Sequence, residues 1–301
     1  MPSLLDVRKN IQATRNTKKI TQAMQLVAAS KMKVFQRKMK HTRAFATDLL
    51  LALHITRQSL FETALGVANP AATDTLFVVL SSDKGLCGSL NAQLLRALQK
   101  SEVFTALTPQ NRHVITIGKK AYEAMRRLQV DVPEHFEGLS ETFDPLDALR
   151  VIDPILERWS TGKYKQVLLV GPKYLNAFSF EPVITQLLPF TTGMLEAALP
   201  DLPDTGDVAV YEPDVSEVRE QLSIQVVQSL LLKSFYELKA TEFSMRMSAM
   251  KKATDAADDR IKLLTLQFNK ARQSAITMQL AELASANEAM SSEESYEIRE
   301  S

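Results

Sequence analysis

The sequence has little cysteine and no long apolar run. Its one cysteine in 301 residues, Cys87, cannot form an internal disulfide, and no Cys/His cluster has the spacing of a zinc site. No run approaches the roughly 20 apolar residues of a membrane span, and the N-terminus lacks the apolar core of a secretory signal. We therefore expect a soluble chain of a reducing compartment, with any membrane association peripheral.

Glycine and proline are few and unevenly placed. All nine glycines and eleven of the twelve prolines lie between Gly66 and Pro213. In a helix interior glycine costs about 1 kcal/mol and proline about 3 kcal/mol relative to alanine. Because residues 3–65 and 214–301 contain neither residue, each stretch can form a continuous helix. The segment between them is expected to be a compact mixed domain.

Apolar residues recur with near-heptad spacing in both of these terminal stretches. The first series runs from Ala28 to Leu60 and the second from Met250 to Met278. Two such seams at opposite ends of one chain favour their pairing in a coiled coil. The seam residues that we expect to be packed are Met32, Phe35, Met39, Ile261, Leu264 and Phe268.

The middle segment alternates strand-like and helix-like patterns. Apolar, β-branched runs lie at 75–81, 113–118 and 166–171, with weaker ones at 180–188 and 207–211. Helical patterns lie at 91–99, 119–128 and 144–159, the last interrupted by Pro154. This alternation predicts a central α/β, Rossmann-like domain with a largely parallel sheet.

No set of residues in the sequence has the pattern of a catalytic or ligand-binding site. The loop SSDKGLCGSLN at 81–91 lies where a phosphate-binding loop would, between a strand and a helix. It lacks both the dinucleotide fingerprint and the Gly-Lys-Ser/Thr of a P-loop, so we interpret it as a tight turn in which Cys87 packs. Asp83 has no local partner, the four histidines are scattered, and Trp159 is expected to anchor packing. We expect no catalytic residue, cofactor or metal ion.

Positive charge is concentrated at the N-terminal end. Residues 1–60 hold twelve Lys/Arg and two Asp/Glu, whereas residues 61–213 and 214–301 have net charges of −6 and −3. The basic first helix favours an acidic partner, which is a nucleic acid, an anionic lipid or an acidic protein surface. Only Phe35 and Phe45 interleave with its basic residues, which argues against single-stranded nucleic acid.

Several segments resemble the gamma subunit of F-type ATP synthases. They are RNTKKITQAMQLVAASKM at 15–32, SSDKGLCGSLN at 81–91, TQLLP at 185–189, RMSAMKKAT at 246–254 and NKARQSAIT at 269–277. The resemblance extends in order from about Leu4 to Ala286. It implies a rotor shaft whose terminal helices form an antiparallel coiled coil inside a hexameric ring of α and β subunits. The α/β domain would lie beside the epsilon subunit and the membrane ring of c subunits.

The resemblance also implies a division of the chain and a set of contacts. The segments would be an N-terminal coiled-coil helix at 1–65, a central α/β domain at 66–213, a C-terminal coiled-coil helix at 214–290 and a polar, acidic tail at 291–301 that we expect to be disordered. The contacts with the ring that it implies are Lys18, Lys19, Met24, Lys31, Arg246, Arg272, Gln273 and Thr277. Gln25 and Gln279 stand where the family often has a carboxylate, and Ala256 stands where it usually has asparagine.

The function that the resemblance implies is coupling of ion flow through the membrane ring to ATP synthesis or hydrolysis on the β subunits. The chain would have no active site, would not bind nucleic acid, and would contact the cytoplasmic face of the bacterial plasma membrane only through the complex. Two alternatives are a nucleotide-binding enzyme with coiled-coil arms and a basic scaffold that binds nucleic acid or lipid. Neither explains the ordered terminal motifs.

Overall fold

The computed structural model describes most of the chain, and the described residues are 4–55, 64–139, 145–191, 194 and 214–300.

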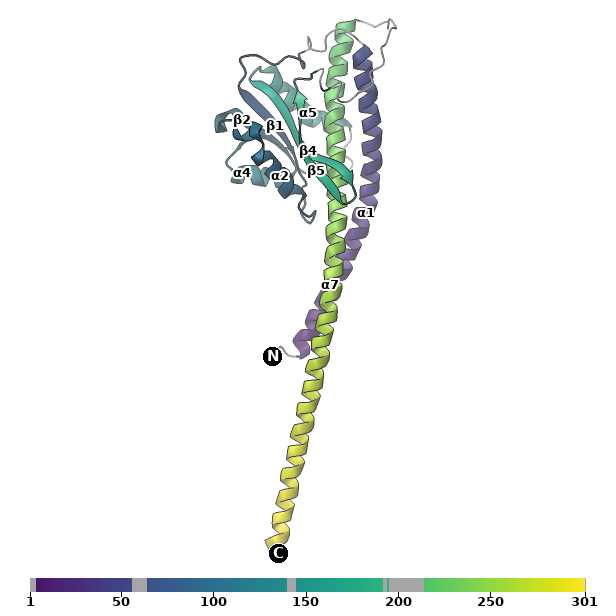
Figure 1. Cartoon of the computed structure of the whole chain (residues 1–301), viewed down its shortest axis with the longest axis vertical. Coiled ribbons are helices and arrows are strands. Elements are labelled where there is room, and N and C mark those ends of the chain that lie inside the picture. The colour runs from purple at the N-terminus through teal and green to yellow at the C-terminus, as the bar shows by residue number, and fades with distance from the viewer. Residues whose placement is uncertain (1–3, 56–63, 140–144, 192–193, 195–213, 301) are drawn as a thin grey trace. The chain divides into compact units, whose positions relative to one another are not determined.

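Two long helices occupy the stretches without glycine or proline. Helix α1 spans Leu4–Ile55, 52 residues, and helix α7 spans Val215–Glu300, 86 residues (Figure 1). Both predicted helices are thus confirmed, although residues 56–63 lie outside the described part. Helix α7 continues through 291–300, where the sequence predicts a disordered tail, and that disorder stays a prediction. None of the described helices combines the length and apolar character that crossing a membrane requires.

The chain divides into two compact units, and both long helices contribute to each. One unit comprises Met1–Gln25 and Met250–Ser301, and the other comprises Leu26–Ala249. In the first unit, Val7 and Ile11 of α1 form a cluster with Leu264 of α7, against which Phe268 packs. Further along, the hydroxyls of Thr21 and Thr254 are 2.8 Å apart. Because residue numbers rise along α1 as they fall along α7, the pair is antiparallel.

The second unit contains the other half of this helix pair. The Phe35 ring of α1 stacks on Phe243 of α7 at a centroid distance of 5.6 Å. Leu50 and Leu53 pack with Val226. The seam predicted in α1 is confirmed here, since Met32 and Phe35 are buried and the half-buried Met39 packs against the same core. Of the seam predicted in α7, which lies in the first unit, Leu264 is buried and Ile261 and Phe268 are half-buried.

The predicted antiparallel pairing of the two helices is confirmed, but the two seams do not pack against each other. In the Leu26–Ala249 unit the α1 seam packs on α7 residues between Val226 and Phe243, whereas in the other unit Leu264 packs on Val7 and Ile11. The part of α7 that packs on the α1 seam also covers the α/β domain. Its buried residues therefore surround the helix instead of forming one stripe, and the periodicity that marks a seam is lost.

The α/β domain contains one mixed sheet. Its strands are β1 Asp74–Leu80, β2 Arg112–Ile117, β3 Asp131–Phe136, β4 Tyr164–Asn176 and β5 Ser179–Leu188. Their order is β3-β2-β1-β4-β5, with three parallel pairs and the antiparallel hairpin β4–β5. Four of these five strands were predicted, and a further predicted strand, at 207–211, lies outside the described residues. Strand β3 was missed because it is an edge strand, DVPEHF, with charges and a proline.

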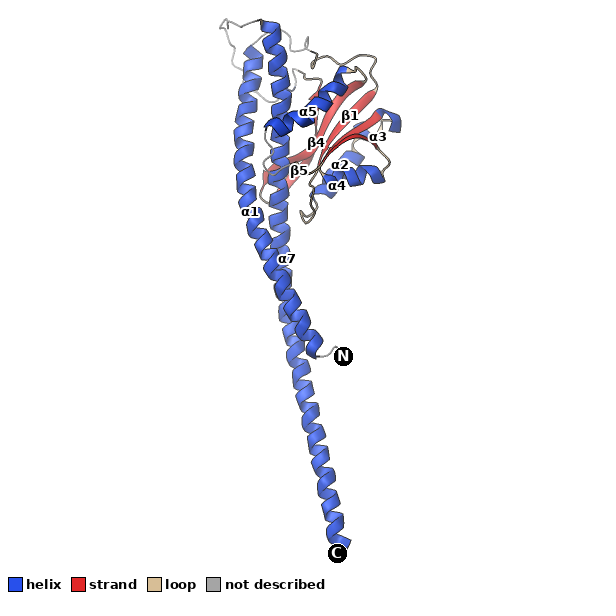
Figure 2. Ribbon diagram, turned by 180° about the vertical axis from the view of Figure 1, so that it is seen from behind, coloured by secondary structure: helices blue, strands red, loops and turns tan. Residues whose placement is uncertain are grey.

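Helices cover both faces of this sheet (Figure 2). They are α2 Leu90–Lys100, α3 Glu102–Thr105, α4 Lys119–Arg127 and α5 Pro145–Ser160, with the 3-10 turn η2 at Pro109–Asn111. Alternate residues of β1 face the two layers: Leu76 and Val78 pack with α5 and the long helices, while Phe77 and Val79 pack with α3 and α4. Such two-sided burial is typical of a parallel sheet and explains the unbroken apolar run of β1.

Candidate subunit-contact surface

The loop between β1 and α2 is a tight turn closed by its own side chains. Asn91 donates through Nδ2 to the Ser82 hydroxyl at 2.8 Å and accepts from the Ser82 backbone N–H at 3.1 Å. Leu86 and Gly88 have φ of 63° and 62°, the left-handed region that tight turns use. Cys87 is only 2% exposed, which confirms the prediction that it packs.

Neighbouring residues that the sequence left open also have packing or capping contacts. Asp83 accepts a hydrogen bond from the Lys119 backbone N–H at 3.0 Å, at the first residue of α4. Trp159 is buried and donates its indole N–H to the Ala64 carbonyl at 2.8 Å, as expected of a packing anchor. Asp83 thus caps the start of α4, and Trp159 joins α5 to the backbone at Ala64.

A buried ion cluster joins the β1–α2 loop to α7. The Glu242 carboxylate lies between Lys239 at 3.2 Å and Arg246 at 2.8 Å. The Arg246 guanidinium also donates to the Gly85 carbonyl at 3.2 Å and lies 5.4 Å from the centroid of the Phe243 ring. Arg246 is 9% exposed, so its charge is balanced within the chain. The sequence motifs at 81–91 and 246–254 therefore meet at this residue.

The other predicted contact residues fall into two groups. Lys18 forms an ion pair with Asp258 at 2.5 Å, Met24 is half-buried, and the Lys31 ammonium lies 5.6 Å from the centroid of the Phe243 ring. Lys18 and Lys31, like Arg246, make contacts inside their own unit. The exposed group comprises Lys19, Arg272, Gln273 and Thr277. Exposure leaves the second group available to another molecule.

Helix α7 also presents an apolar surface that the sequence analysis did not identify. Helix α1 begins at Leu4, and α7 continues past this end of α1 (Figure 1). From 269 to 287 the side chains of α7 are exposed or half-buried, and the exposed apolar ones are Ile276, Met278, Leu280 and Leu283. Ile276, Leu280 and Leu283 have i, i+4, i+7 spacing and so share one face of α7, whereas Met278 lies on another face. Exposed apolar residues that share a face mark a binding surface. The signal was available in the sequence, because two breaker-free stretches of unequal length cannot pair throughout.

A network of ionisable groups lies at the amino end of β1, away from these motifs. His113 lies between Asp131 at 2.8 Å and Asp74 at 3.0 Å, and Asp74 also pairs with Lys163 at 3.1 Å. Burial opposes ionisation of Asp74, but the hydrogen bonds from Lys163 and His113 outweigh it and hold its pKa below the usual value. Within the described ranges, no group of three or more His, Cys, Asp and Glu residues could hold a metal ion.

The family model and the most similar relatives point to the same family. The family model described as ATP synthase matches residues 3–290. The ATP synthase gamma chain of Paraburkholderia phymatum is 36% identical over 291 residues, covering 94% of this chain and 98% of that protein. The gamma chain of Polaromonas naphthalenivorans is 34% identical over 279 residues, covering 92% and 96%.

Solved structures share the fold. The central stalk and c-ring structure of the Tetrahymena thermophila mitochondrial ATP synthase has a chain with a TM-score of 0.58 and 24% identity, covering 78% of this chain and 99% of that one. A chain of the Euglena gracilis mitochondrial ATP synthase gives a TM-score of 0.59 at 19% identity, covering 94% and 95%. Both likenesses concern the fold alone.

Proposed function

The chain belongs to the family of ATP synthase gamma chains, the central-stalk subunits of these complexes, and we propose that it transmits torque through direct contacts with a ring of α and β subunits. The observation that carries this proposal is the exposed stretch of α7 from 269 to 287, which has apolar side chains and no accompanying segment of α1 among the described residues. Exposed apolar side chains on a helix are typical of a surface that another protein covers.

The mechanism requires different contacts at different rotor angles. A shaft changes the conformation of a surrounding subunit only if it binds one conformation better than another. The exposed polar side chains Arg272, Gln273 and Thr277 lie on the same stretch of α7 as the apolar ones. We assign to them the angle-dependent contacts, and to Lys19 a contact of α1 with acidic loops of the β subunits.

Arg246, Lys18 and Lys31 have a different part in this proposal. Each charge is engaged inside the chain, with Glu242, Asp258 and the Phe243 ring respectively. These residues hold the helices and the β1–α2 loop in register, so that force applied to the exposed surface reaches the α/β domain. Met24, half-buried between them in sequence, contributes packing in the same way.

The remaining partners follow from the family. The α/β domain at 66–213 would contact the epsilon subunit and the c ring, while the helices at 1–65 and 214–290 form the shaft and 291–301 an acidic tail. The chain would then lie at the cytoplasmic face of the bacterial plasma membrane, with its membrane contact made only through the complex. Hydrolysis and synthesis would take place on the β subunits, with neither catalytic residues nor nucleic-acid binding on this chain.

Reconstitution tests this function. The chain is mixed with α and β subunits, and native mass spectrometry is expected to find one copy per complex, because a central shaft occupies a single axis. Single-complex rotation is then recorded under ATP, and the isolated chain is assayed for ATPase activity, which we expect to be negligible. The proposal is refuted if two or more copies are found per ring. It is also refuted if an assembled complex hydrolyses ATP without rotation of this chain.

A further inference from the structure

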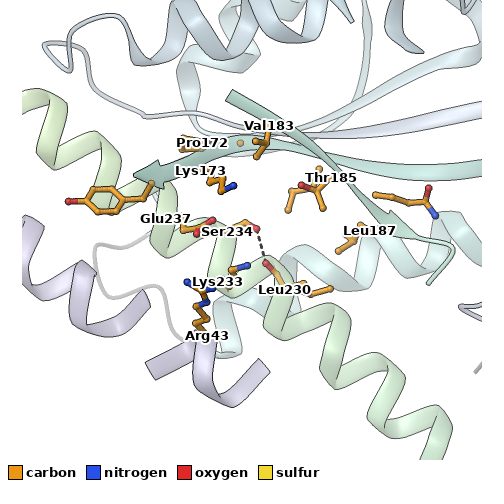
Figure 3. Close-up of a pocket in the computed structure, with 14 residues that line it drawn as sticks. Arg43, Pro172, Lys173, Val183, Thr185, Leu187, Leu230, Lys233, Ser234 and Glu237 are labelled. Atoms are coloured by element: carbon orange, nitrogen blue, oxygen red, sulfur yellow. Dashed lines mark hydrogen bonds between the residues drawn. The ribbon is translucent and has the colours of Figure 1, made fainter. Parts of the chain in front are cut away.

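A cavity of about 360 Å³ lies between α1, α7 and the β4–β5 hairpin, within the Leu26–Ala249 unit. Three cations from three elements line it: Arg43 from α1, Lys173 from β4 and Lys233 from α7 (Figure 3). No ion pair involves any of the three within the part of the chain that the structure describes. The cations therefore share the cavity without a neutralising side chain in contact.

One carboxylate faces these cations. Glu237 lines the cavity one helical turn after Lys233 and forms no ion pair with Arg43, Lys173 or Lys233 among the described residues. Burial raises the pKa of Glu237, and the attraction of Lys233, Arg43 and Lys173 does not offset that effect. Ionised or not, a single carboxyl group cannot neutralise three cations, so the cavity has a positive potential.

Hydroxyl groups complete the lining. Thr185 of β5 contributes a hydroxyl. Tyr174 of β4 also borders the cavity, and its hydroxyl accepts a hydrogen bond at 2.5 Å from Gln36, which lines a neighbouring hollow. Cations combined with hydroxyl donors around a water-accessible hollow are the groups that bind oxyanions of phosphate type.

Further positive charge surrounds this cavity. A second hollow borders Tyr174 and is lined on α1 by Lys33, Arg37 and Lys40. These three cations also have no ion-pair partner among the described residues. Because potentials from neighbouring cations add in a concave site, they attract a multivalent anion more strongly than isolated surface lysines do.

We propose that this cavity binds a divalent tetrahedral oxyanion, a phosphoryl or sulfate group, between Arg43, Lys173 and Lys233. Arg43 supplies a planar fork that can hold two oxygens, and the two lysines supply point charges from the opposite walls. The bound anion links α1, α7 and the β4–β5 hairpin. It therefore stabilises the attachment of the hairpin to the helix pair.

The binding depends on pH through Glu237. The groups that face it are Lys233 on its own helix, Arg43 from α1, and Lys173 and Tyr174 from β4; β5 contributes the neutral Thr185 and Gln186. The protonated carboxyl group can donate to the anion, whereas the ionised one repels it. Affinity is thus highest at low pH and falls as pH rises through the raised pKa of Glu237.

The test is calorimetric titration of the full-length chain with sodium sulfate in a low-chloride buffer. Sulfate stays doubly charged between pH 5 and 8, so any pH dependence comes from the protein. We expect one saturable site, with weaker binding at higher pH. Inorganic phosphate and ATP serve as further probes. Similar affinities for both indicate a site for the free anion, and tighter ATP binding that depends on the same cations indicates a nucleotide phosphoryl group.

Substitutions locate the site. Lys173→Met and Lys233→Met are each expected to weaken sulfate binding about tenfold, the effect of removing one cation near a divalent anion. Lys165→Met is the matched control, because Lys165 is an exposed lysine of the same strand that does not line the cavity. Glu237→Gln is expected to strengthen binding at pH 8 and to abolish its pH dependence. Circular dichroism establishes that each variant is folded.

Three results would overturn the proposal. They are the absence of saturable sulfate binding up to 50 mM, equal weakening by Lys165→Met and Lys173→Met, and an unchanged pH profile in Glu237→Gln. A fourth test uses the assembled complex. It is treated with an acetylating reagent, and the modification of Lys173 and Lys233 is measured. If both lysines are protected in anion-free buffer, an acidic surface of a partner subunit fills the cavity in place of a small oxyanion.

Discussion

Replacing Arg246 by alanine should destabilise the Leu26–Ala249 unit strongly. The substitution removes the 2.8 Å ion pair with Glu242 and the 3.2 Å hydrogen bond to the Gly85 carbonyl. Removing one partner of a buried ion pair costs about 3–5 kcal/mol, because the other charge stays buried. Lys239 remains 3.2 Å from Glu242, so we expect the lower end of that range. For a unit of this size about 3 kcal/mol corresponds to a fall in Tm of roughly 6–12 °C.

The single tryptophan makes this measurement specific to the unit. Trp159 is buried in the α/β domain, so its fluorescence reports unfolding there and not in the other unit. Arg272→Ala is the control, since Arg272 is an exposed arginine of the same helix and its removal should leave Tm unchanged. The triple variant Lys239→Met/Glu242→Leu/Arg246→Met should regain most of the lost stability, because no charge of the buried cluster is then left unpaired. If Arg246→Ala unfolded at the same temperature as the parent chain, Arg246 would not anchor the loop.

Four further predictions concern the shaft, its surface, its tail and the sheet. Leu264→Asp places a charge in the packed cluster with Val7 and Ile11 and should lower the helical signal or prevent assembly, whereas Leu266→Asp, at a position 67% exposed, should melt like the parent chain; equal melting of both would contradict the helix pairing. Arg272→Ala should fold and assemble but slow single-complex rotation, and Arg272→Lys should restore part of the rate; parent-like rotation in the alanine variant would remove Arg272 from the contact surface. Deletion of 291–301 should leave assembly and the direction of torque unchanged; loss of assembly would show that the tail is structural. Asp74 has a lowered pKa, so its ion pairs stabilise the folded state above the unfolded-state value of 3.8 and lose that effect as pH falls through the folded-state pKa. Asp74→Asn should therefore lower Tm at pH 7 and reduce the acid-induced loss of stability measured by Trp159 fluorescence; an unchanged profile would refute this.

The long helices and most of the sheet could be predicted because their causes are local. Without glycine or proline a stretch can continue as a helix, and apolar β-branched runs such as that of β1 form strands wherever both faces are covered. Pro154 was expected to interrupt the helix at 144–159, yet α5 continues from Pro145 to Ser160. The helix tolerates it because Val151, Ile152 and Ile155 are fully buried on either side of it, and this packing offsets the lost backbone hydrogen bond.

The partner of each seam could not be predicted, because register is set by tertiary contacts. The seam pattern identified the packed residues of α1 correctly, including Met32 and Phe35. It did not identify their partners, since Tyr236 and Phe243 lie where α7 is buried by both α1 and the sheet. An amphipathic pattern reports one buried face, so a helix buried on several sides escapes it.

The candidate contact residues show a related limit. The resemblance places Arg246 and Arg272 in motifs of the same kind. The residues next to them in sequence do not indicate which arginine is buried and which is exposed. The structure separates them through a distant residue: the Gly85 carbonyl, 161 positions away in sequence, is one of the partners of Arg246. Arg272 lies on the stretch of α7 beyond Phe268, where its side chain is exposed.

Torque applied to α7 must reach the α/β domain through side-chain contacts, and a short stretch of the helix adds polar contacts to the apolar packing of Val227, Leu231 and Phe235. Arg246 bonds to the Gly85 carbonyl, and the Ser244 hydroxyl donates to the Ala177 carbonyl in the turn of the β4–β5 hairpin. Gly88 approaches Met245 so closely that an added Cβ would lie 3.5 Å from its terminal methyl group. Three consecutive residues of α7 thus contact two separate loops of the domain. Because contacts to two loops resist rotation of the helix about its own axis better than a single contact does, residues 244–246 strengthen the coupling between shaft and domain that the apolar packing of α7 provides.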